Sequence, residues 1–115
     1  MKETFVLIFR EGSRKLSEQD QKNRIEAVRN WALQQVQEHN LEPRVLDDGG
    51  RQLGEDADGN SQGRPVIALN FIEAENFEEA VKVAQSHPGL RYGVGIEVRS
   101  WRDPRPAKRR APSPA

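Results

Sequence analysis

The apolar residues of the chain gather in short runs separated by polar stretches, and three of these runs have the character of strands. Residues 5–9 are apolar and β-prone throughout, and residues 65–72 form a second run of this kind. Between residues 92 and 99, apolar positions alternate with glycine or charged positions. Short runs rich in β-branched and aromatic residues, or with a period of two, are typical of strands. The pattern therefore predicts a strand at each of the three places.

The segment after the first strand carries the start signal and the spacing of a helix. Ser17 followed by Asp20 resembles a capping box, in which the hydroxyl accepts a hydrogen bond from an amide of the first turn. Behind it, four apolar residues at spacings of three and four form one stripe: Ile25, Val28, Ala32 and Val36. Trp31 widens or flanks that stripe. Asn40 is expected to end the helix, since asparagine tolerates the left-handed conformation.

The residues that follow predict a less regular segment. Residues 43–46 begin an extended stretch, which the polar residues 47–50 interrupt and which resumes near Leu53. We interpret this stretch as one strand with a glycine bulge, in preference to a small hairpin. Residues 55–63 are polar and contain glycine, so we expect them to form a loop.

A second helix is expected after Asn76, which has Glu79 three positions later, and residues 87–89 (His-Pro-Gly) are expected to stop it. The order β-α-β-β-α-β predicts an α+β domain of the ferredoxin-like kind. Two helices can cover one face of such a sheet, yet residues 5–9 and 65–72 are apolar on both faces. A second copy of the sheet would cover the other face, and this predicts a homodimer.

The composition narrows the function classes. The chain lacks cysteine, which excludes a disulfide scaffold, a thiol nucleophile and cysteine-ligated zinc. Its two histidines are far apart, so we expect no metal site, and the absence of a phosphate-binding glycine loop or cofactor fingerprint leads us to expect no cofactor. The first apolar run has only five residues, fewer than a signal peptide or a membrane helix needs. We therefore expect a cytoplasmic protein without a membrane partner.

The formal net charge is zero, but basic residues are concentrated at the C-terminal end. Residues 102–115 hold five basic residues, one acidic residue and four of the seven prolines, and they lack a large apolar side chain. Because proline removes backbone donors and nothing there offsets the entropy of ordering, we expect a domain at 1–101 followed by a disordered basic tail. An acidic body with a basic tail does not indicate a uniform nucleic-acid-binding surface.

Several segments, in the right order, resemble the YCII-related (DGPF-domain) proteins of the dimeric α+β barrel superfamily. They cover roughly residues 4–101 and are Phe5–Arg10, Gly49–Leu53, Phe71–Ala74 with Phe77–Ala80, His87-Pro88 and Ile96–Arg99. The Asp-Gly-Pro-Phe segment of the family is not intact here. Its closest remnant is Asp58-Gly59, and a gapless count selects Asp56 instead.

The resemblance implies that His87 and one acidic residue, Asp56 or Asp58, form an acid–base pair acting on small metabolites. An imidazole that titrates near neutral pH suits such work. From the residues alone, we prefer to interpret His87 as a residue that ends a helix and faces its dipole, and only the resemblance makes the acid–base role as good an interpretation. The aspartates, beside glycine in a polar loop, are interpreted as turn residues in preference to a catalytic partner.

Three charged residues on the strands are candidates for binding a substrate. Arg10 ends the first strand, where its guanidinium could hold an anion by a bidentate contact. Glu97 and Arg99 share the glycine-bearing face of the last strand, where Gly93 and Gly95 leave room for a ligand or for another backbone. If Glu97 and Arg99 face inward, pairing with other charges is the alternative role.

Two hypotheses follow. The first is a YCII-related metabolite-binding protein or a cofactor-free lyase or isomerase that uses His87 as acid or base. The second is a non-catalytic dimeric interaction or regulatory module whose basic tail engages an acidic partner.

Overall fold

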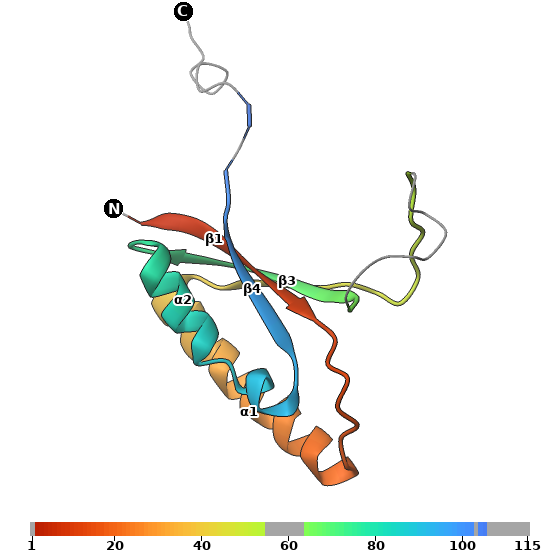
Figure 1. The fold of residues 1–115 in the computed structure, drawn as a ribbon. Helices are drawn as coiled ribbons and strands as arrows, with labels where there is room; N and C mark the ends of the chain where they lie inside the picture. Colours follow the sequence, from red (N-terminus) through yellow and green to blue (C-terminus); the bar gives the residue numbers. More distant parts are fainter. Residues whose placement is uncertain (1, 55–63, 103, 106–115) are drawn as a thin grey trace, which may run out of the picture.

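The computed structural model describes residues 2–54, 64–102 and 104–105. These residues form an α+β structure with an open four-stranded antiparallel sheet in the order β2-β3-β1-β4. Both helices lie on one side of the sheet (Figure 1). In chain order the elements are β1 (Glu3–Arg10), α1 (Glu18–His39), β2 (Glu42–Val45), β3 (Val66–Ala74), α2 (Phe77–Gln85), the 3-10 helix η1 (Pro88–Tyr92) and β4 (Gly95–Ser100).

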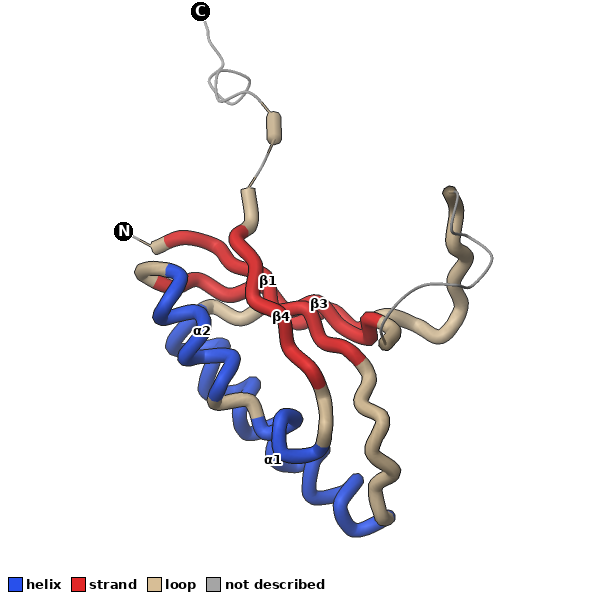
Figure 2. Tube along the Cα trace, viewed as in Figure 1, coloured by secondary structure: helices blue, strands red, loops and turns tan. Residues whose placement is uncertain are grey.

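The sheet has two faces of different character, which we call the helix face and the open face. Phe5, Leu7 and Phe9 of β1 point to the helix face and are at most 4% exposed. Their alternate neighbours Val6 and Ile8 point to the open face, because successive side chains of a strand project to opposite sides. Figure 2 shows both helices on the same side of the strands, so no helix covers the open face in the described part of the chain.

The start of α1 agrees with the sequence pattern, but the predicted buried stripe is only half right, since Val28 and Ala32 are half-buried and its other two members are exposed. The amide of Asp20 donates to the Ser17 hydroxyl at 3.0 Å, as the capping box predicts. Trp31 is 6% exposed, whereas Ile25 and Val36 of the expected stripe are 53% and 49% exposed. An indole removes more area from water than an isoleucine or a valine does, so the helix rotates to bury Trp31.

The second helix also begins where the sequence predicts. Asn76 accepts from the amide of Glu79 at 2.8 Å, and the Glu79 carboxylate accepts from the amide of Glu75. The last strand, in contrast, begins at Gly95 and not at the predicted Tyr92. The 3-10 helix η1 takes up residues 88–92, and Gly93, with a φ of 93°, turns the chain in the left-handed region that glycine accepts without strain.

The stretch that we expected to be a bulged strand is much shorter. Strand β2 ends at Val45, only the amide of Leu46 still bonds to β3, and residues 47–54 contain no strand. Leu53 is 86% exposed, so no packing holds it against the sheet. The prediction that the strand resumes near Leu53 after a glycine bulge is therefore wrong. The expected loop at 55–63 lies outside the described residues.

Strand β4 ends at Ser100, and the amide of Trp101 still donates to the Thr4 carbonyl at 3.3 Å. Of the predicted tail, only residues 102, 104 and 105 are described, and they lie outside helices and strands. None of the helices among the described residues has the length and apolar character needed to cross a membrane.

Candidate functional site

His87 lies on the helix face, at the junction of α2 and η1. Helix α2 ends at Gln85, and His87 caps the N-terminus of η1 because its Nδ1 accepts from the amide of Gly89 at 2.9 Å. A Cβ on Gly89 would come within 2.9 Å of the imidazole, so glycine is needed for this close approach. The expectation that His87 ends α2 is confirmed at the backbone, where its amide donates to the Ala84 carbonyl at 3.1 Å, whereas its imidazole caps η1 and does not serve the dipole of α2.

The imidazole is buried between two aromatic rings. Phe9 and Trp31 meet it edge-on, with ring centroids 4.7 and 4.6 Å away, and His87 is only 7% exposed. The indole Nε1 of Trp31 donates to the Ser86 hydroxyl at 2.8 Å. This bond ties the middle of α1 to the end of α2 and fixes both rings beside His87.

The surroundings of His87 make it a neutral residue at physiological pH. Burial, and secondly the nearby charge of Arg24, lower its pKa from 6.5 to about 4. Since Nδ1 accepts a hydrogen bond, the single proton of the neutral ring resides on Nε2. His87 therefore offers an N–H donor and not a positive charge.

His87 lines a cavity of about 280 Å³ between α1 and the helix face of the sheet. Its lining is mostly apolar and comes from β1, α1, β2, β3 and the segment 87–94: Phe9, Val28, Trp31, Ala32, Leu41, Pro43, Val45, Ile67, Ala68, Gly89 and Val94. Three polar side chains, Arg24, Asn70 and His87, also line it. An apolar cavity with a few polar groups is the usual form of a small-molecule site.

The three charged candidates on the strands lie on the other side of the sheet. Arg10, Glu97 and Arg99 project to the open face, because they alternate with Phe9, Ile96 and Val98, which belong to the core or pack against it. Glu97 is 3.6 Å from the Arg10 guanidinium and 2.9 Å from that of Arg99. The hydrogen bond from Arg99 is the main cause that lowers the pKa of the Glu97 carboxyl.

The sheet thus separates two groups of residues that the sequence suggested as parts of one site. Arg10, Glu97 and Arg99 form one exposed cluster, and His87 lies in the cavity on the opposite face. Asp56 and Asp58 lie outside the described residues. Trp31 and Arg24 were not recognised as site residues from the sequence. The size of Trp31 was the available signal, whereas nothing in the sequence distinguishes Arg24 from Arg29, the other arginine of its helix.

The described residues, 2–54, 64–102 and 104–105, contain no group of three or more histidine, aspartate or glutamate side chains arranged to hold a metal ion.

No protein-family model matches the chain, and no curated protein matches it in sequence.

Proposed function

We propose that the chain binds a small, largely apolar metabolite in the cavity beside His87. The observation that carries this proposal is the cavity itself. It has a volume of about 280 Å³, and its mostly apolar lining includes three polar side chains. Apolar walls provide affinity by desolvation, and the few polar groups orient the ligand. Trp31 and Phe9 offer aromatic surface to an aromatic or branched ligand, and the Nε2–H of His87 offers a hydrogen bond.

The same geometry bears on the acid–base role that we expected for His87. A general base must accept a proton at a ring nitrogen that has a free lone pair. In His87 the Nδ1 lone pair accepts from the Gly89 amide, and Nε2 already carries the proton, so neither nitrogen is free to accept one. In the other tautomer Nδ1 would carry the proton, so the Nδ1–H and the Gly89 N–H would face each other as two donors and the hydrogen bond would be lost. We therefore rank binding above catalysis, and a cofactor-free lyase or isomerase would use the neutral His87 as a hydrogen-bond donor.

Trp31 gives a direct test of ligand binding, because its side chain lines the cavity. We would titrate the protein with a panel of naphthyl acids, amides and alcohols and follow the indole signals by NMR. Trp101, on the open face against Phe71, provides the internal control. We expect the Trp31 signal to shift and the Trp101 signal to stay. If no member of the panel moves Trp31, the proposal fails.

A variant that fills the cavity completes the test. Ala68 lines the cavity from β3, so Ala68→Leu places three further carbon atoms in the space a ligand would take. We expect this variant to keep its cooperative unfolding and to lose binding. Undiminished binding by a folded Ala68→Leu protein would place the ligand elsewhere.

We further propose that the open face pairs with a second copy of the chain, as in a ferredoxin-like dimeric α+β barrel of the YCII-related type. What supports this is the apolar centre of the face, formed by Val6 and Ile8 of β1 and their β3 partners Phe71 and Leu69. A self-complementary apolar patch is the usual basis of a twofold dimer.

Sedimentation of the wild type and of Phe71→Glu tests the dimer. The added carboxylate would be buried without a partner at the centre of the interface. We therefore expect the wild type to sediment as a dimer and Phe71→Glu as a monomer. A monomeric wild type at micromolar concentration removes the proposal. The alternative module, which acts through the basic tail, depends mainly on residues outside the described part and stays a prediction.

A further inference from the structure

Arg24 is the unusual residue of the cavity. Its Nε is buried and has no hydrogen-bond partner among the described residues, and none of their acidic side chains forms an ion pair with it. A buried donor without a partner loses its hydration and gains nothing in return, and the loss is larger for a charged group. Arg24 is half-buried as a whole, and a ligand that reaches its Nε would supply the missing partner.

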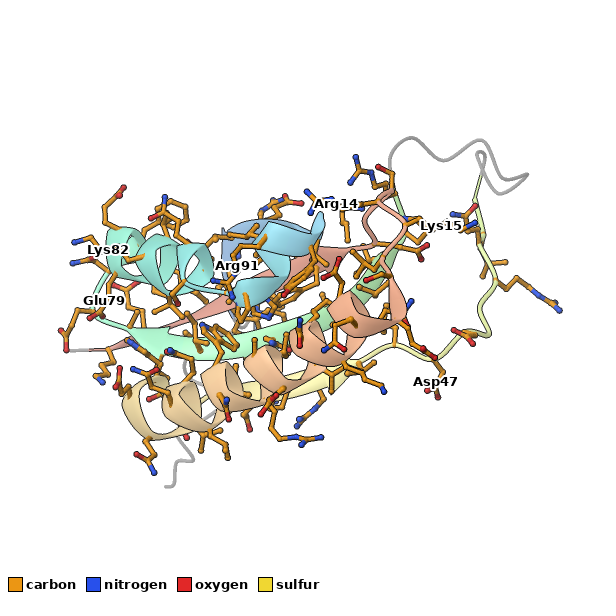
Figure 3. The ribbon with its side chains drawn as sticks, turned by 90° about the horizontal axis from the view of Figure 1, so that it is seen from below. Arg14, Lys15, Asp47, Glu79, Lys82 and Arg91 are labelled. Atoms are coloured by element: carbon orange, nitrogen blue, oxygen red, sulfur yellow. The ribbon has the colours of Figure 1, made fainter. Side chains whose placement is uncertain are left out.

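Arg24 stands at the boundary between two cavities. Together with Ile67 and Val94 it lines both the apolar cavity beside His87 and an adjoining cavity of about 290 Å³. The adjoining cavity also has Arg14 and Lys15 in its lining, while Glu11 is the acidic side chain there. Figure 3 shows Lys15 toward the end of the molecule opposite Glu79 and Lys82, with Arg14 between them.

The charged side chains on both sides of this boundary are mainly basic. The apolar cavity contains the Arg24 cation and no acidic side chain among its described lining, and the adjoining cavity has three cations, Arg24 included, against one carboxylate. A ligand that spans the boundary therefore meets apolar walls at one end and positive potential at the other. Attraction of this kind favours an anionic group on the ligand.

We propose that the ligand is an apolar carboxylic acid, with its hydrocarbon or aromatic body beside Trp31 and its carboxylate on Arg24. A guanidinium matches a carboxylate by parallel N–H···O bonds. Arg10 and Arg99 are less suited to this role, because Glu97 already occupies them on the open face. This inference rests on the proposed function and assigns both the chemical class of the ligand and the residue that selects it.

The experiment compares 2-naphthoate with 2-naphthamide, two probes of nearly the same shape that differ in charge. Binding is followed at the Trp31 indole signal in the wild type and in Arg24→Met, Arg24→Lys and Arg29→Met. Arg29 is the matched control, since it is an exposed arginine of the same helix and does not line the cavity of His87. Thermal unfolding of each variant reports whether it is folded.

We expect the wild type to bind the acid about tenfold or more tightly than the amide, the factor typical of a hydrogen bond to a charged group. Arg24→Met should abolish this preference and leave the amide affinity nearly unchanged, Arg24→Lys should restore part of it, and Arg29→Met should retain it.

The outcomes separate this inference from the proposed function. Equal binding of acid and amide by the wild type would refute the carboxylate assignment and leave the metabolite cavity standing. A preference that survives in Arg24→Met would assign the anion to another residue and equally overturn the inference. Failure of both probes, and of the wider panel, would overturn the inference together with the proposed function. If the Arg24→Met variant does not unfold cooperatively, Arg24→Lys and the wild-type preference decide.

Discussion

Replacing His87 by asparagine should remove a specific part of the pH dependence of stability. An asparagine side chain can cap η1 as His87 does, because its carbonyl oxygen can accept from the Gly89 amide. It does not titrate. Comparison of the two proteins therefore isolates the effect of protonating His87 from the effect of the changed packing, which shifts stability equally at every pH.

The magnitude follows from the pKa of His87, which burial lowers from 6.5 to about 4. Between these values the unfolded chain binds a proton that the folded chain does not, so the free energy of unfolding decreases as the pH falls. The stabilisation is fully present above about pH 6.5 and is lost progressively toward pH 4. One pKa unit corresponds to about 1.4 kcal/mol, which gives a loss of about 2 kcal/mol at pH 5 and about 3 kcal/mol once His87 is protonated in both states.

Urea unfolding followed by far-UV circular dichroism, at a series of values between about pH 7 and pH 5, measures this difference. The wild type should lose about 2 kcal/mol more than His87→Asn over that range. Exposed carboxylates affect both proteins and cancel in the comparison. Parallel curves for the two proteins would refute the reasoning, since they would show that His87 takes up its proton as readily in the folded state as in the unfolded state.

Substitutions at three further positions test the local structure. Trp31→Phe removes the hydrogen bond to the Ser86 hydroxyl, and we expect a loss of about 1–2 kcal/mol in urea unfolding, whereas an unchanged midpoint would contradict the bond. Gly12→Ala places a Cβ 2.5 Å from the Gly93 carbonyl oxygen. We expect this clash to destabilise the protein by about 1–3 kcal/mol in thermal unfolding. An unchanged stability would show that the backbone at Gly12 does not contact Gly93. Asn40, with a φ of 51°, closes α1 in the left-handed region. Asn40→Gly should therefore be more stable than Asn40→Ala by about 1 kcal/mol in the same assay. The reverse order would contradict this conformation.

The elements that the sequence predicted well are those whose signals are local. Caps at Ser17 and Asn76 depend on bonds within one turn, and both were recognisable as short patterns. The strand at 66–74 was recognisable from its continuous apolar residues. In contrast, the extent of β2 depends on which residues find a partner in β3, and no pattern within residues 42–54 encodes that partner.

The site was harder to predict because it depends on which way each element faces. Apolar residues occupy both faces of β1, so alternation alone does not say which face the helices cover. Arg10 and His87 were therefore candidates for one site. Arg24 escaped notice for a related reason: on sequence it is one of several charged residues of α1, and only the rotation that buries Trp31 brings it to the cavity.

The register of the central strands is what keeps the cavity and the open face apart. Phe9 lies beside His87 and its neighbour Ile8 lies on the open face, so a shift of one residue would exchange them. The pairing of β1 with β3 changes register once, between Phe9 and Arg10, which pair with Ala68 and Val66. Ile67 is the extra residue, and both Ile67 and Ala68 line the cavity, which strict alternation would not allow. The bulge therefore widens the apolar wall at the end of the sheet nearest Arg24, and it does so without moving Arg10 from the open face.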